Sequence, residues 1–234
     1  MHKQSRSTSE RRSFLSSFNA GIASLAALAV GGVAMAQDKP AANTRWEPAR
    51  HDKDDWLDKV PGRHRLVVDT TSADGFGAGL AFASNFIRAN RTDYGLQSND
   101  LAVVIVARHQ STPFAFSDAI WAKYGVTIAA QSRFVDPKSK LPAKANVYSS
   151  GDYGSLLNNL GVTLDSLAKQ GVQMAVCAMA TRRFAGAIAE AAGSNVDTVY
   201  NELTANLVAN SHMAPAGIVA VSRAQERGYT FVSA

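Results

Sequence analysis

The sequence contains a single cysteine, Cys177, in a chain of 234 residues. One thiol cannot form an intramolecular disulfide, so we expect the fold to be stabilised by core packing. Structural zinc sites built from three or four cysteines are excluded for the same reason. A lone thiol in an oxidising compartment is either buried and inert, paired between chains, or used in chemistry.

Several familiar binding and catalytic motifs are also missing. The sequence has neither the Gly-Lys-Ser/Thr of a P-loop nor the Gly-x-Ser-x-Gly of a serine hydrolase. Gly75, Gly77 and Gly79 suggest a dinucleotide-binding loop, but Leu80 stands where the third glycine is required. The compact ligand spacings of zinc sites are absent as well. We therefore expect the three glycines to form a flexible turn that leads into a helix. We expect the protein to use neither a cofactor nor a metal.

Positive charge is modest once the N-terminus is set aside. The formal net charge is +5, of which the first 36 residues carry +3 through four basic residues and Glu10, so about +2 remains. No basic stripe with interleaved aromatic residues occurs, and we expect no nucleic-acid partner.

The N-terminus has the pattern of an export signal. Arg11 and Arg12 precede a mild apolar stretch over residues 20–33, which ends in the small-residue triplet 34–36. This pattern is typical of a cleaved twin-arginine signal, so we predict a signal peptide over residues 1–36 and a periplasmic protein. The stretch falls short of the roughly 20 strongly apolar residues that span a bilayer, so no stable membrane span is expected after cleavage. An uncleaved N-terminal anchor is the alternative.

Two further regions follow the signal. Residues 37–62 are polar and contain three prolines, which predicts an N-terminal arm with a helical turn near 54–60. Trp46 and Trp56 are the candidates for pinning this arm. The globular pattern begins at residue 63, and we predict one domain over 63–234.

Short β-like segments alternate with helical patterns in this domain. The expected strands are 65–70, 101–108, 172–177, 206–212 and 229–233. The expected helices are 76–90 with Asp74 as N-cap, 117–124, 164–170, 181–192, 197–203, and 215–227 with Pro215 as its first residue. Residues 131–151 interrupt this rhythm and predict an exposed excursion. The alternation predicts an α/β fold, a three-layer sandwich with a mainly parallel sheet of about five strands.

Polar side chains gather where these strands are expected to end. The candidates are Asp69 after the first strand, Arg108 and His109 after the second, Cys177 after the third, and His212 after the fourth. Ligands bind beyond the carboxyl ends of the strands in an open parallel sheet, so these groups are predicted along one edge. A metal site would require His109, Cys177 and His212 to converge with a carboxylate.

Cys177 is the strongest chemical candidate. It precedes a predicted helix, and the positive end of a helix dipole favours the nucleophilic thiolate. His109 lies in a polar turn, where it either assists the thiol or simply hydrogen-bonds the loop. The alternative for Cys177 is a small buried apolar residue at the end of a strand, and the alternative for His212 is a residue that merely ends a strand.

The chain from about His64 to Val232 resembles the DsrE/DsrF-like family, which includes the YchN-type proteins. The resemblance rests on four stretches: LAVVIVARH, FSDAIWAKYG, GVQMAVCAMA and PAGIVAVSRAQERGYTFV. It implies a small α/β sandwich assembled as a homotrimer or homohexamer, in which a cysteine carries sulfur as a persulfide. The family's cysteine corresponds to Cys177, and the polar loop of the family to His109. The export signal, the arm over 37–62 and the stretch 131–151 depart from the family pattern.

The resemblance leads to the expectation of an exported sulfur-transfer protein rather than a turnover enzyme. Cys177 would accept sulfane sulfur, with His109 or Arg108 stabilising the thiolate or an anionic donor, and with Asp69 and His212 as further substrate-binding residues. A thiol-bearing acceptor protein would then take the sulfur from Cys177. The rival hypothesis is a non-catalytic module that binds a small molecule or anion in the same strand-end pocket.

Overall fold

The computed structural model describes residues 47–234. Its strands form one five-stranded sheet in the order β4-β3-β2-β1-β5, and every neighbouring pair is parallel. The strands are β1 (His64–Thr70), β2 (Leu101–Ala107), β3 (Gln173–Cys177), β4 (Ser211–Ala214) and β5 (Thr230–Ser233). The predicted α/β class with a parallel sheet is therefore confirmed.

Helices connect these strands, as parallel neighbours require. The α-helices are α1 (Trp56–Lys59), α2 (Ala73–Tyr94), α3 (Asp118–Ser132), α4 (Leu164–Ala168), α5 (Ala178–Ala192), α6 (Val196–Ala205) and α7 (Gly217–Gln225). Short 3₁₀ turns are η1 (Asp52–Asp54), η2 (Ser98–Asp100), η3 (His109–Ala115), η4 (Val147–Ser149) and η5 (Gly154–Leu156). Within residues 47–234, no helix combines the length and the apolar character that crossing a membrane requires.

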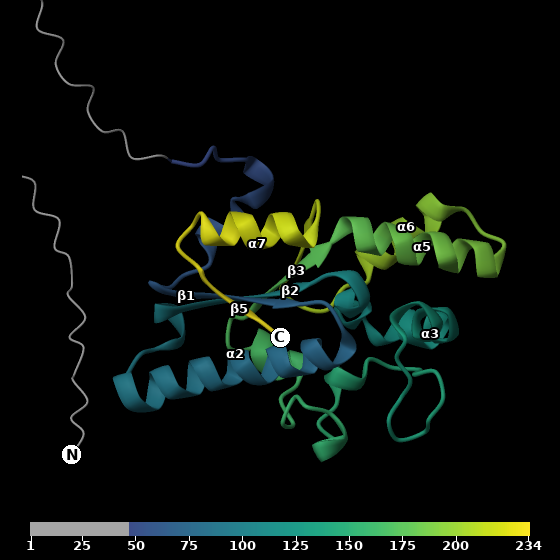
Figure 1. The fold of residues 1–234 in the computed structure, drawn as a ribbon, viewed down its shortest axis with the longest axis horizontal. Coiled ribbons are helices and arrows are strands. Elements are labelled where there is room, and N and C mark those ends of the chain that lie inside the picture. Colours follow the sequence, from purple (N-terminus) through teal and green to yellow (C-terminus); the bar gives the residue numbers. More distant parts are fainter. Residues whose placement is uncertain (1–46) are drawn as a thin grey trace, which may run out of the picture. The chain divides into compact units, whose positions relative to one another are not determined.

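The sheet is covered on both faces, which makes three layers (Figure 1). α2 and α4 pack on one face, where Val68 of β1 and Ile105 of β2 are fully buried. α7 packs on the other face and contacts all five strands, over Val67 and Val104. Successive residues of a strand point to opposite faces, so the nearly unbroken apolar run of β2 supplies both cores.

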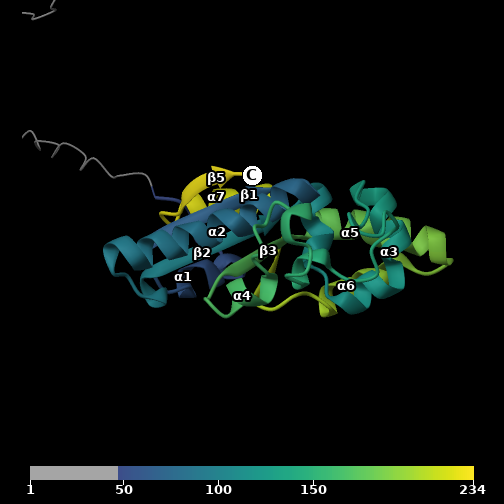
Figure 2. The same cartoon turned by 90° about the horizontal axis from the view of Figure 1, so that it is seen from below.

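Three helices pack together beyond the end of the sheet (Figure 2). α5 packs against α6 and α3, and η3 connects this group to β2 and β3. Phe184 of α5 and Trp121 of α3 are fully buried and belong to the same core as the α2 face of the sheet. The α2-side core therefore continues from the sheet into this group of helices.

Part of the predicted arm packs directly on the sheet. The expected helical turn is present as η1 and α1, and Leu57 and Val60 lie in the core beneath α7. Arg65 donates hydrogen bonds to three backbone carbonyls of this segment, those of Leu57, Val60 and Gly62. The last part of the arm, residues 56–62, is thus joined to the domain by both apolar and polar contacts.

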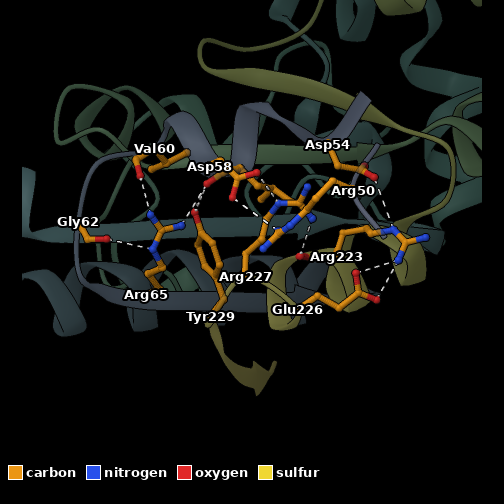
Figure 3. A network of polar contacts seen from close by, with 11 residues as sticks. Arg50, Asp54, Asp58, Val60, Gly62, Arg65, Arg223, Glu226, Arg227 and Tyr229 are labelled. Carbon is orange, nitrogen blue, oxygen red and sulfur yellow. Dashed lines mark hydrogen bonds and ion pairs between the residues drawn. The ribbon is translucent and has the colours of Figure 1, made fainter. Parts of the chain in front are cut away.

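Ion pairs hold the same segment against α7 (Figure 3). Arg227 donates to Asp58 at 2.9 Å, and Arg223 lies 3.5 Å from Asp54 and bonds Glu226. The Tyr229 hydroxyl donates to the Leu57 carbonyl at 3.0 Å. These contacts fix η1 and α1 against α7 and against the residues that connect α7 to β5.

Several predicted boundaries are wrong. The fourth strand starts at Ser211 instead of 206, because Leu207 and Val208 pair with the η3 segment. α2 is capped by Ser72 rather than Asp74, since the Ser72 hydroxyl accepts from the Gly75 amide. α7 begins after Pro215, at Gly217. α3 extends to Ser132, so the excursion begins later than predicted. The predicted signal peptide, together with residues 37–46 of the arm, lies outside the described residues.

Candidate functional site

The site lies at the carboxyl edge of the sheet, where β1, β2 and β3 end side by side. Ala107 pairs with Val176, so the next residues along, Arg108 and Cys177, follow at the same level of the edge. Asp69 is the penultimate residue of β1 and lies on the α7 face, like Val67. Four of the five predicted site residues are therefore close to one edge: Asp69, Arg108, His109 and Cys177.

Arg108 and Asp69 form a two-pronged ion pair. The Nε and Nη2 groups of Arg108 each donate to one oxygen of Asp69 at 2.7 Å. The Asp69 side chain is 5 % exposed and that of Arg108 is 28 % exposed. The hydrogen bonds to Asp69 raise the pKa of Arg108 against the opposing effect of burial, and the negative charge of Asp69 adds to the increase. Arg108 therefore stays charged beside the thiol.

A buried hydroxyl pair fixes the backbone from which Arg108 extends. The Thr70 hydroxyl donates to the Val106 carbonyl at 2.8 Å and lies 2.9 Å from the Ser111 hydroxyl. The Arg108 amide in turn donates to the Ser111 hydroxyl at 3.0 Å. Both hydroxyl groups are fully buried. They join the ends of β1 and β2 to η3, and they had no signal in the sequence beyond their residue type.

Gly217 lets α7 approach this ion pair. A Cβ built at Gly217 would lie 2.3 Å from Cβ and 2.7 Å from Cδ of Arg108. The stem of Arg108 therefore runs directly under the first residue of α7. The sequence marked this region only as the start of a helix, and it did not indicate the close approach.

Cys177 is at once the last residue of β3 and the N-cap of α5. Its Sγ accepts a hydrogen bond from the Ala180 amide at 3.3 Å, and its carbonyl accepts from the Thr181 hydroxyl at 2.9 Å. α5 begins at Ala178, immediately after it. The residue is 7 % exposed, so its sulfur is largely shielded from solvent. The predicted position at a helix N-terminus is confirmed.

His109 lies at the surface of the same edge, in a left-handed backbone conformation with φ 58°. Arg183 donates to its carbonyl at 3.4 Å, and the next amide, that of Gln110, donates to Thr71 at 3.0 Å. Among the described residues, no hydrogen bond or ion pair joins the imidazole to Cys177. The backbone of His109 is fixed by these contacts, and the ring is open to solvent.

His212 does not join this group. It lies inside β4, paired with Ala175, and its ring stacks on Trp56 with centroids 4.2 Å apart. Its Nε2 is 2.9 Å from the Gln173 side-chain oxygen. The prediction that His212 ends the fourth strand is wrong because that strand begins and ends later than expected. Burial lowers the pKa of His212, so the neutral ring is favoured as a packing partner for Trp56.

The edge thus combines a recessed thiol, a helix N-terminus and a guanidinium held by a buried carboxylate. This combination can stabilise a thiolate and favour the approach of an anion toward it. Within residues 47–234, no cluster of three or more His, Cys, Asp or Glu side chains is arranged to hold a metal ion.

The comparisons with known proteins do not identify a family. No family model matches the sequence, and no curated protein matches it. A solved structure of a protein of unknown function, MTH1491 from Methanobacterium thermoautotrophicum, is similar at 15 % identity with a TM-score of 0.37. The match covers 73 % of this chain and 99 % of that one.

Proposed function

We propose that this chain is an exported DsrE-like protein that carries sulfane sulfur as a persulfide on Cys177. The observation that supports the proposal most directly is the place of Sγ at the amino end of α5, where it accepts the Ala180 N–H bond. The amino end of a helix in general favours a thiolate, which is the nucleophilic form of a cysteine.

The loading step is an attack of the Cys177 thiolate on a sulfane sulfur. With polysulfide, a new S–S bond forms to Cys177 while the terminal S–S bond of the donor breaks, and a polysulfide shorter by one sulfur leaves with its two negative charges. With thiosulfate, sulfite leaves in the same way. The product in each case is a Cys177 persulfide anion, so no further oxidant or reductant is needed.

Arg108 supports this step by its charge and by the direction of its free donors. Two of its N–H groups are held by Asp69, and Nη1 makes no hydrogen bond within residues 47–234. Nη1 is thus free to meet an anionic donor. Asp69 acts through Arg108, as a positioning residue.

The rival function is a binding module that holds an anion through Arg108 and uses Cys177 only for packing. The ion pair with Asp69 weakens the attraction of Arg108 for an anion in both functions, so it does not separate them. Two substitutions distinguish the proposed function from the rival. The rival predicts that Arg108→Ala weakens anion binding and that Cys177→Ala does not.

The test is intact-mass spectrometry of the protein after exposure to polysulfide or thiosulfate, with Cys177→Ser as the matched control. We expect a gain of whole sulfur atoms that a thiol reductant removes and that the control lacks. The proposal fails if the folded protein gains no sulfur while the unfolded protein is modified readily, because Cys177 would then be a buried structural thiol.

A further inference from the structure

Two large apolar side chains stand exposed at the carboxyl edge of the sheet. Met179, in the first turn of α5, is 69 % exposed, and Ile218, in the first turn of α7, is 59 % exposed. Single exposed apolar residues are ordinary on protein surfaces. These two are notable for their position, because each follows a residue of the site.

The register of the sheet and the packing of α7 bring both residues to the edge of the sheet where Cys177 lies. Cys177 pairs with Ala214, and Met179 comes two residues after Cys177. Ile218 follows Gly217, which lies directly against Arg108. Figure 1 shows the start of α7 next to the start of α5. Met179 and Ile218 therefore lie in the first turns of two helices that begin at this edge of the sheet.

One arginine of this edge, Arg183, carries a positive charge that no acidic side chain within residues 47–234 pairs with. Asp69 compensates Arg108, and Asp197 compensates Arg182. Arg183, by contrast, donates only to the His109 carbonyl and lies 4.9 Å from the centre of the Phe184 ring, with no acidic partner in the described part of the chain. The amino ends of α5 and α7 both lie here and add the positive ends of their dipoles.

We propose that Met179, Ile218, Arg183 and the exposed His109 form a docking rim for an acidic segment of a partner protein. An apolar side chain of the partner would pack on Met179 and Ile218, and its carboxylates would face Arg183 and the two helix ends. The segment would thereby bring a thiol or persulfide to Cys177. The sulfur cargo depends on the function proposed above, whereas the docking rim does not.

Discharge through this rim is a simple exchange. The partner thiolate attacks the outer sulfur of the Cys177 persulfide, the S–S bond to Cys177 breaks, and the Cys177 thiolate leaves. The partner becomes the persulfide, so atoms and charge balance without a further reagent. The reverse reaction loads Cys177 from a partner that already carries the sulfur.

The test uses disulfide exchange, which probes docking without any sulfur cargo. Two synthetic peptides of equal length each carry one cysteine activated as a 2-pyridyl disulfide and flanked by leucine. The remaining charged residues are glutamate in one peptide and lysine in the other. Cys177 is the only thiol of the chain, so release of pyridine-2-thione reports its reaction alone. Neutral 2,2′-dithiodipyridine measures the access of a small reagent.

We expect the glutamate peptide to react about tenfold faster than the lysine peptide at low salt. The advantage shrinks as ionic strength rises, since charges are screened over about 10 Å at 0.1 M. Met179→Ser and Ile218→Ser should each slow both peptides several-fold and leave the small reagent unchanged. Leu141→Ser is the matched control, because Leu141 is exposed in the excursion away from the rim.

Arg183→Gln tests the charge separately. It should remove most of the preference for the glutamate peptide, while Arg91→Gln at an exposed position of α2 leaves that preference intact. Equal rates for the two peptides, or serine variants that behave like wild type, would overturn the docking rim. A folded protein that does not react even with the small reagent would overturn it too. Peptide selectivity without sulfur loading would retain the rim and reject the proposed function.

Discussion

At the scale of single residues, Gly217 determines how closely α7 can approach the site. A side chain at this position would collide with the β- and δ-carbons of Arg108, which cannot move far while Asp69 holds the guanidinium. The two contacts depend on each other, because the ion pair fixes the arginine stem and the stem fixes the start of the helix.

We predict that Gly217→Ala destabilises the protein by about 1–3 kcal/mol, the usual cost of overpacking a well-filled site. The displaced Arg108 should also slow sulfur loading of Cys177. Urea unfolding measures the first effect, and the rate of mass gain measures the second.

Gly186→Ala in α5 is the matched control. A Cβ at Gly186 meets no atom within 4 Å, so alanine should be neutral or stabilise the helix by up to about 1 kcal/mol. If Gly217→Ala were as stable as Gly186→Ala, the close approach of α7 to Arg108 would be contradicted.

At the scale of elements, the sequence was most informative where the apolar pattern was strong. The bounds of β1, β2 and β3 agree with prediction to within a residue, because each is a compact apolar run. β4 was misplaced since its own residues, Ser211–Ala214, are less apolar than the preceding Leu207 and Val208. The side-chain period alone could not distinguish a strand from a segment that packs against η3.

The candidate site shows the same division between local and long-range information. Cys177 at a helix N-terminus follows from local sequence, and the structure confirms it. The pairing of Arg108 with Asp69 joins residues 39 apart, and the contact with Gly217 is longer still. The first contact arises from the parallel pairing of β1 with β2 and the second from the packing of α7 across the sheet, and no local pattern specifies either. His212 was predicted at the edge only because the fourth strand was expected at 206–212, whereas β4 is Ser211–Ala214.

The contact between α1 and β4 leads to a pH prediction. Burial lowers the pKa of His212 below the unfolded value of about 6.5, so the unfolded state binds the proton more readily. Above that value His212 is neutral in both states, so it makes no contribution to the pH dependence of stability. Between the unfolded and the folded pKa, stability falls as the pH drops. The loss levels off once the pH is below the folded pKa. Urea unfolding from pH 8 to pH 5 should show this decline.

His212→Gln should flatten that part of the profile, even if the variant is less stable at every pH because the stack on Trp56 is lost. His64→Gln is the control, since His64 is exposed at the start of β1 and its loss should leave the decline in place. An unchanged decline in His212→Gln would contradict the assignment.

At the scale of the whole described domain, the two cores share one sheet. Val67 and Val68 of β1 are adjacent in sequence but belong to opposite cores, and both are fully buried. α7 with α1 on one face, and α2 with α4 on the other, can bury their apolar sides only against these strands. Loss of one layer therefore exposes the strands that the other layer requires.

We predict that both layers unfold in a single transition, and tryptophan allows each layer to be followed separately. Trp56 reports on the α7 face and Trp121 on the opposite core, and Trp46 can be replaced by Phe in both reporters. The Trp56 reporter also carries Trp121→Phe, and the Trp121 reporter also carries Trp56→Phe. In each variant, fluorescence should give the same urea midpoint as far-UV circular dichroism. A Trp56 signal that changes at lower urea than the dichroism would mean that α1 detaches first. In that case, the ion pairs and the stack between Trp56 and His212 would not keep α1 on the sheet up to the main unfolding transition.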